Sequence, residues 1–317
     1  MTRFPLVPAS FFSVVLGVAG LGNGWRVVAR IWQTPHWIGE SLLAVAALIW
    51  LVVAVFYVAK WFFARADALA EIRDPVQSCF VGLVGVATLL IAVAIAPYSK
   101  AIGWALFALG VAIQFGFSIY LTGSWWRGGR DLGATTPALY LPLGAGNFVT
   151  AIALDALGSQ GWAILFFGAG LFSWLAIESA LLHRLMVHAP MANGLRPTLG
   201  IQLAPPTVGT LAWLSSNGGV PDLFAQAMTG YALLQALILL SLLPWIRQQA
   251  FSPGYWAFSF GATALTVVLL RMREQKDPVA AADLALPLFI LVNLLVAALL
   301  IRTIILIARG RLLPATH

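Results

Sequence analysis

Residues 136–157, TPALYLPLGAGNFVTAIALDAL, are followed after three residues by residues 161–184, GWAILFFGAGLFSWLAIESALLHR. Both stretches are apolar and have the length of about 20 residues that a helix needs to cross the bilayer core. The first is interrupted by proline, glycine and small polar residues, whereas the second is much smoother. This pair predicts a hairpin made of one broken and one regular membrane helix.

The same alternation recurs along the whole chain. Pro8, Pro75 and Pro142 are each 67 residues apart, and Pro206 follows 64 residues later, a period equal to one helical hairpin. We therefore predict an all-α polytopic membrane protein with ten transmembrane helices in five tandem helical hairpins. The expected helices are 8–30, 37–63, 76–96, 100–122, 136–157, 161–184, 198–217, 223–246, 251–271 and 284–308.

Composition supports a chain that lies almost wholly in the membrane. Hydrophobic residues make up 61% of the 317 and charged residues only 9%, far less charge than the surface of a soluble domain needs. The apolar run from Leu6 lacks a small-x-small cleavage site, so we expect a first membrane helix there rather than a signal peptide. Residues 1–317 are interpreted as a single transmembrane domain.

The net charge of +7 is distributed unevenly between the two expected sides of the membrane. Twelve basic residues lie on the side of the termini, against six on the other side, as the positive-inside rule predicts for cytoplasmic loops. We therefore expect both termini in the cytoplasm and no nucleic-acid partner. The twelve are Arg3, Lys60, Arg65, Arg73, Arg127, Arg130, Arg184, Arg196, Arg247, Arg302, Arg309 and Arg311, and the six are Arg26, Arg30, Lys100, Arg271, Arg273 and Lys276.

The broken segments are predicted to form an inner ring of five kinked helices around a central pore. Proline removes a helical hydrogen bond and frees backbone carbonyls, which lipid cannot satisfy but a hydrated passage or a neighbouring helix can. Parallel repeats of this kind are related by an axis along the membrane normal. The expected kinks are at Pro8, Pro75, Pro142, Pro205, Pro206 and Pro253, and the candidate pore-lining residues are Phe12, Phe148, Phe258, Ser13, Asn147, Thr210 and Ser259.

A simpler alternative is that glycines and hydroxyls in these segments only allow helices to pack closely. Gly20 and Gly24 fit that pattern. Because all five broken segments share the bias, we favour a pore over packing alone.

Buried acidic groups are scarce, and this bears on the transported charge. Only Glu178 lies well inside an expected span, whereas cation-coupled and proton-coupled transporters keep carboxylates at membrane depth. Its position on a smooth helix favours a structural anchor, with a coupling role left open. A pore without acidic rings suits anions better than cations.

Signatures of catalysis and of cofactor binding are missing from the sequence. It contains no His-Glu-x-x-His, no Gly-x-Ser-x-Gly and no P-loop, and Cys79 is its only cysteine. We therefore expect no enzyme, no metal and no cofactor.

The run from Trp256 to Gly261 reads WAFSFG and follows Pro253. Phe258 and Phe260 are two residues apart, so about 200° separates them around a helix and only one can point into a passage. An aromatic ring in a narrow lumen closes it by dewetting. The residues alone do not choose between the two.

Five stretches of the chain resemble the bacterial tellurite-resistance protein A family, related to slow-type anion channels of plants and to C4-dicarboxylate/malate transporters. They are 136–142, 168–175, 199–205, 256–261 and 287–289. The resemblance implies a pore within each protomer, a homotrimer, and a phenylalanine gate on the ninth helix. The plant run Trp-Ala-Tyr-Thr-Phe corresponds to residues 256–260, which places the implied gate at Phe260.

The sequence thus leaves three hypotheses. The first is a multi-pass anion channel or uniporter in the bacterial inner membrane that passes chloride, nitrate, dicarboxylates or oxyanions. The second is a proton-coupled C4-dicarboxylate or oxyanion carrier that uses Glu178. The third, a membrane scaffold or intramembrane enzyme, is disfavoured by the missing catalytic clusters. The family's name reports a resistance phenotype and does not establish tellurite as the transported ion.

Overall fold

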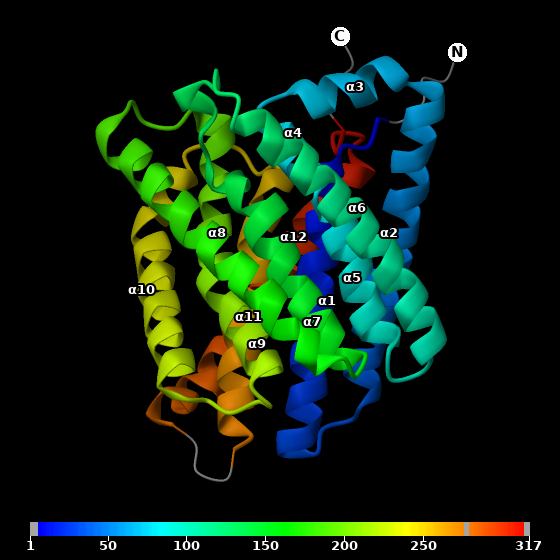
Figure 1. The fold of residues 1–317 in the computed structure, drawn as a ribbon, viewed down its shortest axis with the longest axis vertical. Helices are drawn as coiled ribbons and strands as arrows, with labels where there is room; N and C mark the ends of the chain where they lie inside the picture. Colours follow the sequence, from blue (N-terminus) through cyan, green and yellow to red (C-terminus); the bar gives the residue numbers. More distant parts are fainter. Residues whose placement is uncertain (1–5, 276–278, 314–317) are drawn as a thin grey trace.

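The computed structural model describes residues 6–275 and 279–313, so Arg3 and Lys276 of the charge count lie outside the described residues. The described chain is almost entirely helical and contains no strand (Figure 1). Its helices are η1 (Ala9–Phe11), α1 (Phe12–Trp32), α2 (Trp37–Phe63), α3 (Arg65–Arg73), α4 (Gln77–Val81), α5 (Leu83–Ile95), α6 (Lys100–Trp125), η2 (Leu132–Ala134), η3 (Pro137–Leu139), η4 (Leu141–Ala145), α7 (Gly146–Ala156), α8 (Gln160–Val187), η5 (Asn193–Leu203), α9 (Ala204–Ser216), α10 (Leu223–Ile246), η6 (Pro253–Trp256), α11 (Ala257–Arg273), η7 (Ala280–Leu284) and α12 (Ala285–Ala308).

Nine helical segments in the described chain are long and apolar enough to cross a membrane. The prediction of an all-α polytopic membrane protein is confirmed. The segment expected at 198–217 is not among the nine, so the count of ten is not confirmed by length and composition. There the 3₁₀-helix η5 precedes only 13 residues of α-helix, because Pro205 and Pro206 occupy the first turn of α9.

Burial separates the spans into two sets that alternate along the chain. In the spans Ala9–Trp32, Gln77–Ile95, Pro137–Ala156 and Pro253–Arg273, between 67% and 89% of the most apolar 18-residue window is buried. In α2, α6, α8, α10 and the α12 span the share is only 22–28%. Figure 1 shows α10 and α2 at opposite edges with α1, α7 and α11 between them. The broken segments are therefore the interior ones, and the smooth helices surround them.

Three of the six prolines that we expected at kinks lie where the interior segments begin. Pro8 precedes η1, Pro75 lies in the turn before α4, and Pro253 is the first residue of η6. Pro142 lies within the π-helical turn η4. Proline is tolerated at a helix start because the amide that it lacks has no intrahelical acceptor there.

Side chains bond the carbonyls in these irregular turns. Ser13 donates to the Ser10 carbonyl at 2.6 Å, and within the regular helix α9 Thr210 donates to the Pro206 carbonyl at 2.6 Å. The Pro142 carbonyl accepts from Gln114 at 2.5 Å and from Ser118 at 2.6 Å, both on α6. Buried carbonyls thereby keep partners where neither water nor lipid would supply them.

The first and last interior helices, α1 and α11, meet along a seam of small residues. A Cβ on Gly17 would lie 2.3 Å from Ser259 Oγ and 2.6 Å from Ser259 Cβ, and one on Gly20 would lie 2.2 Å from Thr263 Oγ1. Only glycine fits at these two positions without moving the helices apart. The seam brings the two ends of the repeat series together.

We predict that Gly17→Ala destabilises the protein by about 1–3 kcal/mol, the usual cost of overpacking a close contact. The thermal unfolding temperature in detergent measures the effect. The matched control is Gly116→Ala on α6, where a Cβ would meet nothing within 4 Å. Equal unfolding temperatures for the two variants would contradict the seam.

Candidate functional site

A wide cavity of about 760 Å³ opens at the end of the molecule where the interior segments begin. We call it the terminal-side vestibule, because Leu6 and Leu313, at the two ends of the described chain, both line it. Its other walls come from the starts of α1, α4, η5 and η6, and the charged side chains in its lining are Lys60, Asp67, Glu71 and Arg311.

Glu71, from the short helix α3, anchors the first interior segment at this vestibule. Its carboxylate accepts from the Ala9 backbone amide at 2.8 Å and from Lys60 Nζ at 3.0 Å. Lys60 and Glu71 are 4% and 7% exposed, so the ion pair is largely buried in the wall of the vestibule. The contact satisfies an amide at the start of η1, which has no side-chain cap of its own.

A second cavity, of about 300 Å³, lies between the opposite ends of the interior helices. We call it the distal vestibule. Residues of α1, α5, α7, α9 and α11 all line it, so five interior helices converge there. The lining residues closest to the helix starts are Gly20, Leu90, Ile152, Val208 and Phe260. Phe260 is the largest side chain of this innermost layer.

The charged residues in the lining of the distal vestibule are Arg26, Arg30 and Arg271, with no Asp or Glu among its described lining residues. Arg26 pairs with Glu40 at 2.7 Å, and Arg30 pairs with Glu274 at 2.6 Å. Both carboxylates lie outside the lining. The rim of the cavity is therefore basic in composition, and carboxylates just outside it compensate two of its three charges.

Tyr98, in the loop after α5, supports this rim from outside. Its phenol donates to Glu40 Oε2 at 2.6 Å, and this hydrogen bond to a carboxylate raises the pKa of Tyr98 above its ordinary value. Glu40 is thus held by Tyr98 as well as by Arg26.

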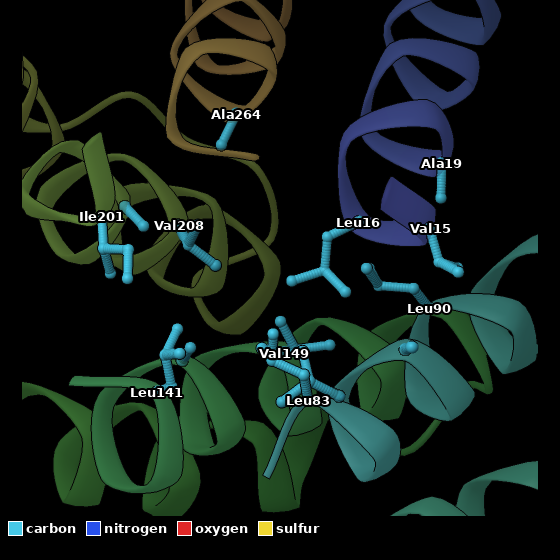
Figure 2. Packing of buried hydrophobic residues seen from close by; sticks show 14 of the residues in the cluster. Val15, Leu16, Ala19, Leu83, Leu90, Leu141, Val149, Ile201, Val208 and Ala264 are labelled. Carbon is cyan, nitrogen blue, oxygen red and sulfur yellow. The ribbon is translucent and has the colours of Figure 1, made fainter. Parts of the chain in front are cut away.

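An apolar layer separates the two vestibules. On α1 the terminal-side lining ends at Ser13 and the distal lining begins at Gly20, a gap of about 10 Å along the helix axis. Figure 2 shows Leu16 and Val149, which line neither vestibule, directed toward the space that the interior segments share. Both are at most 2% exposed. The two vestibules are separate cavities in this structure.

The structure separates the two phenylalanines of the WAFSFG run. Phe260 is half-buried and lines the distal vestibule. Phe258 instead packs over Gly200 of η5, where a Cβ would lie 2.7 Å from the ring, and stacks on Tyr255. Of the pair, only Phe260 lines the distal vestibule.

Phe12 and Phe148 are fully buried between helices and line neither vestibule. Phe12 makes an edge contact with Tyr57 of α2, and Phe148 packs on Phe167 of α8. These rings join the interior helices to the surrounding ones.

The four polar residues that we expected to line a pore do not lie in one cavity. Ser13 lines the terminal-side vestibule, whereas Thr210 and Ser259 are fully buried and bonded to carbonyls of their own segments. Asn147 lines a separate cleft of about 400 Å³ with residues of α6 and α8. The seven candidates therefore do not form one lining.

Glu178 sits at the centre of a buried hydrogen-bond cluster on α8. Its carboxylate accepts from Trp174 at 2.9 Å, from Gln202 at 3.0 Å, from Tyr231 at 2.8 Å, and from the Tyr140 hydroxyl. The donors come from α8, η5, α10 and the turn between η3 and η4. Glu178 lines neither vestibule, and its bonds join four parts of the chain.

We predict that Glu178→Ala lowers the free energy of unfolding by about 3 kcal/mol or more, because four donors, three of them on buried residues, lose their acceptor together. Chemical or thermal unfolding in detergent measures this. Asp283→Ala is the control, since Asp283 is exposed and forms a surface ion pair with Arg273 worth at most about 1 kcal/mol. A loss at Glu178 no larger than at Asp283 would argue against the anchor.

The sequence does not predict that Arg26, Arg30 and Arg271 line one cavity, and their distribution indicates only the topology. The available signal was their position near the far ends of broken segments, because such ends must meet if the segments surround a passage. In the part of the chain that the structure describes, no group of three or more His, Cys, Asp or Glu residues could hold a metal ion.

An interior set of broken helices, two vestibules and a closed apolar layer are features of membrane channels and transporters. Residues 7–304 match the SLAC1 family model, described as voltage-dependent anion channel. The chain belongs to this family of membrane anion channels and transporters.

Individual relatives agree with this membership. The chain is 34% identical over 263 residues to the tellurite resistance protein TehA homolog of Haemophilus influenzae, covering 83% of this chain and 80% of the relative. It is 24% identical to the S-type anion channel SLAH3 and 23% to the guard cell S-type anion channel SLAC1, both of Arabidopsis thaliana. These matches cover 94% and 96% of this chain but only 48% and 56% of the plant proteins.

Proposed function

We propose that the protein is a passive anion channel or uniporter whose passage is closed by Phe260. The observation that carries the proposal is the distal vestibule. Five interior helices converge on it, the charges in its described lining are all basic, and its innermost layer contains one large ring. Small anions would enter this positive field and stop at Phe260.

Anion selectivity follows from the charges around the passage. The positive rim raises the local anion concentration, and the positive ends of the interior helix dipoles lie toward the terminal-side vestibule. Without a carboxylate in the described part of the distal lining, cations gain no partner there. Anions that lose water easily would pass most readily.

The proposal also includes the orientation of the protein in the membrane, its oligomeric state and its candidate anions. We place both termini in the cytoplasm of a bacterial cell and the distal vestibule on the outer face of the inner membrane. The exposed apolar faces of α2, α6, α8, α10 and α12 would contact lipid and two further copies in a homotrimer. Chloride, nitrate, C4-dicarboxylates and tellurite are the anions to compare, because relatives include a tellurite resistance protein and anion channels.

A proton-coupled carrier is the second candidate, and Glu178 is the observation that would favour it. Against this candidate, all donors around Glu178 already point to its carboxylate, and neither vestibule reaches it. A coupling carboxylate must exchange protons with both sides, which requires access to water.

We predict that Phe260→Ala raises anion flux into liposomes by about tenfold or more over wild type, because removing the ring opens the innermost layer to water. Phe258→Ala is the matched control, since Phe258 packs on η5 and should leave flux close to wild type. The assignment of Phe260 as the gate would be wrong if Phe260→Ala, reconstituted in an equal amount, gave the same anion flux as wild type.

We further predict that flux does not respond to an imposed pH gradient and that Glu178→Gln, where it folds, retains this insensitivity. Flux that follows the pH gradient in wild type and loses this response in Glu178→Gln would favour the coupled carrier instead.

A further inference from the structure

The basic rim of the distal vestibule contains one arginine that differs from the other two. Arg26 and Arg30 each donate twice to a carboxylate, through Glu40 and Glu274 respectively. Arg271 lines the same cavity, yet within residues 6–275 and 279–313 its guanidinium has no hydrogen bond or ion pair. Among the described residues, its guanidinium thus leaves hydrogen-bond donors for a ligand in the cavity.

The position of Arg271 on α11 links it to the closed layer. Phe260, Ala264, Val267 and Arg271 follow one another at helical spacing, and all four line the distal vestibule. They form one stripe of the helix, with Arg271 about 16 Å outward from Phe260 along the axis. An anion held at Arg271 would lie in line with the ring.

A purely structural role for Arg271 would require a protein partner. Two carboxylates, Asp155 at the end of α7 and Glu274 just after α11, are within electrostatic range, but neither forms an ion pair with it. Asp155 instead accepts from Gln160 at 3.2 Å and is not among the lining residues. Arg273, two residues further along α11, pairs with the exposed Asp283 and faces away from the cavity.

We infer that Arg271 binds a small oxyanion in the distal vestibule, with Arg26 and Arg30 contributing charge. A guanidinium presents parallel N–H donors that match a carboxylate or nitrate group better than they match a spherical halide. Asn23, in the same lining, supplies a further amide donor. The cavity volume of about 300 Å³ accommodates such an ion with water. The site rests on the proposed function, for which it is the capture step before Phe260.

The test is anion binding by the full-length protein in detergent, measured as the rise in unfolding temperature with nitrate or malate at constant ionic strength. A ligand that binds the folded state raises this temperature in proportion to ln(1 + [L]/Kd). We expect Arg271→Gln to raise the half-saturating nitrate and malate concentrations by about tenfold, since it removes a charge-assisted hydrogen bond. Chloride should stabilise wild type less than either oxyanion.

Two further variants keep the result interpretable. Arg273→Gln removes a charge from the same helix outside the cavity and should bind like wild type. Arg271→Lys keeps the charge without the planar fork, so its affinity should fall between wild type and Arg271→Gln. Half-saturation unchanged in both Arg271 variants, or weakened equally by Arg273→Gln, overturns the site.

Flux measurements separate this site from the proposed function. Anion flux through Phe260→Ala liposomes together with unchanged binding in the Arg271 variants overturns the site and leaves the channel standing. Arg271-dependent binding without flux in any variant supports the site and overturns the channel.

Discussion

The close approach of α1 and α11 is the contact on which the rest of the structure depends. These are the first and last interior helices in chain order, and they meet where Gly17 and Gly20 face Ser259 and Thr263. Without side chains on the two glycines, Phe260 on α11 can stand beside the α1 wall of the distal vestibule. The seam thus positions the ring as well as closing the fold.

A second constraint is that an irregular segment inside a membrane must have its backbone carbonyls hydrogen-bonded. Each irregular turn leaves carbonyls without helical donors, and neighbours such as Ser118 and Gln114 satisfy the Pro142 carbonyl. Most of the polar side chains in the interior segments are therefore used for the backbone rather than for an ion. The charges that an ion can meet lie in the vestibules, where Arg26, Arg30 and Arg271 form the distal rim.

The fold class followed from the alternation of broken and smooth apolar segments, because hydropathy and proline position report directly on membrane helices. The family resemblance pointed to Phe260, and the structure gives that ring a place in the distal lining while Phe258 packs on Gly200. The direction of a side chain depends on tertiary packing, so the sequence could not show that Phe12 and Phe148 pack between helices and line neither vestibule. The common position of Arg26, Arg30 and Arg271 in one cavity could not be predicted for the same reason. In the sequence, a charged residue near a helix end gives the same pattern whether its side chain faces a loop or a cavity.

Thiol accessibility tests the closed passage most directly. In a Cys79→Ser background, Asn23→Cys lies in the distal vestibule and Ser13→Cys in the terminal-side one, ten residues apart on α1. A membrane-impermeant anionic thiol reagent applied from the distal side should modify Asn23→Cys and spare Ser13→Cys, and it should reach both when Phe260→Ala is added. Modification of Ser13→Cys from the distal side with Phe260 intact would contradict a passage closed at that ring.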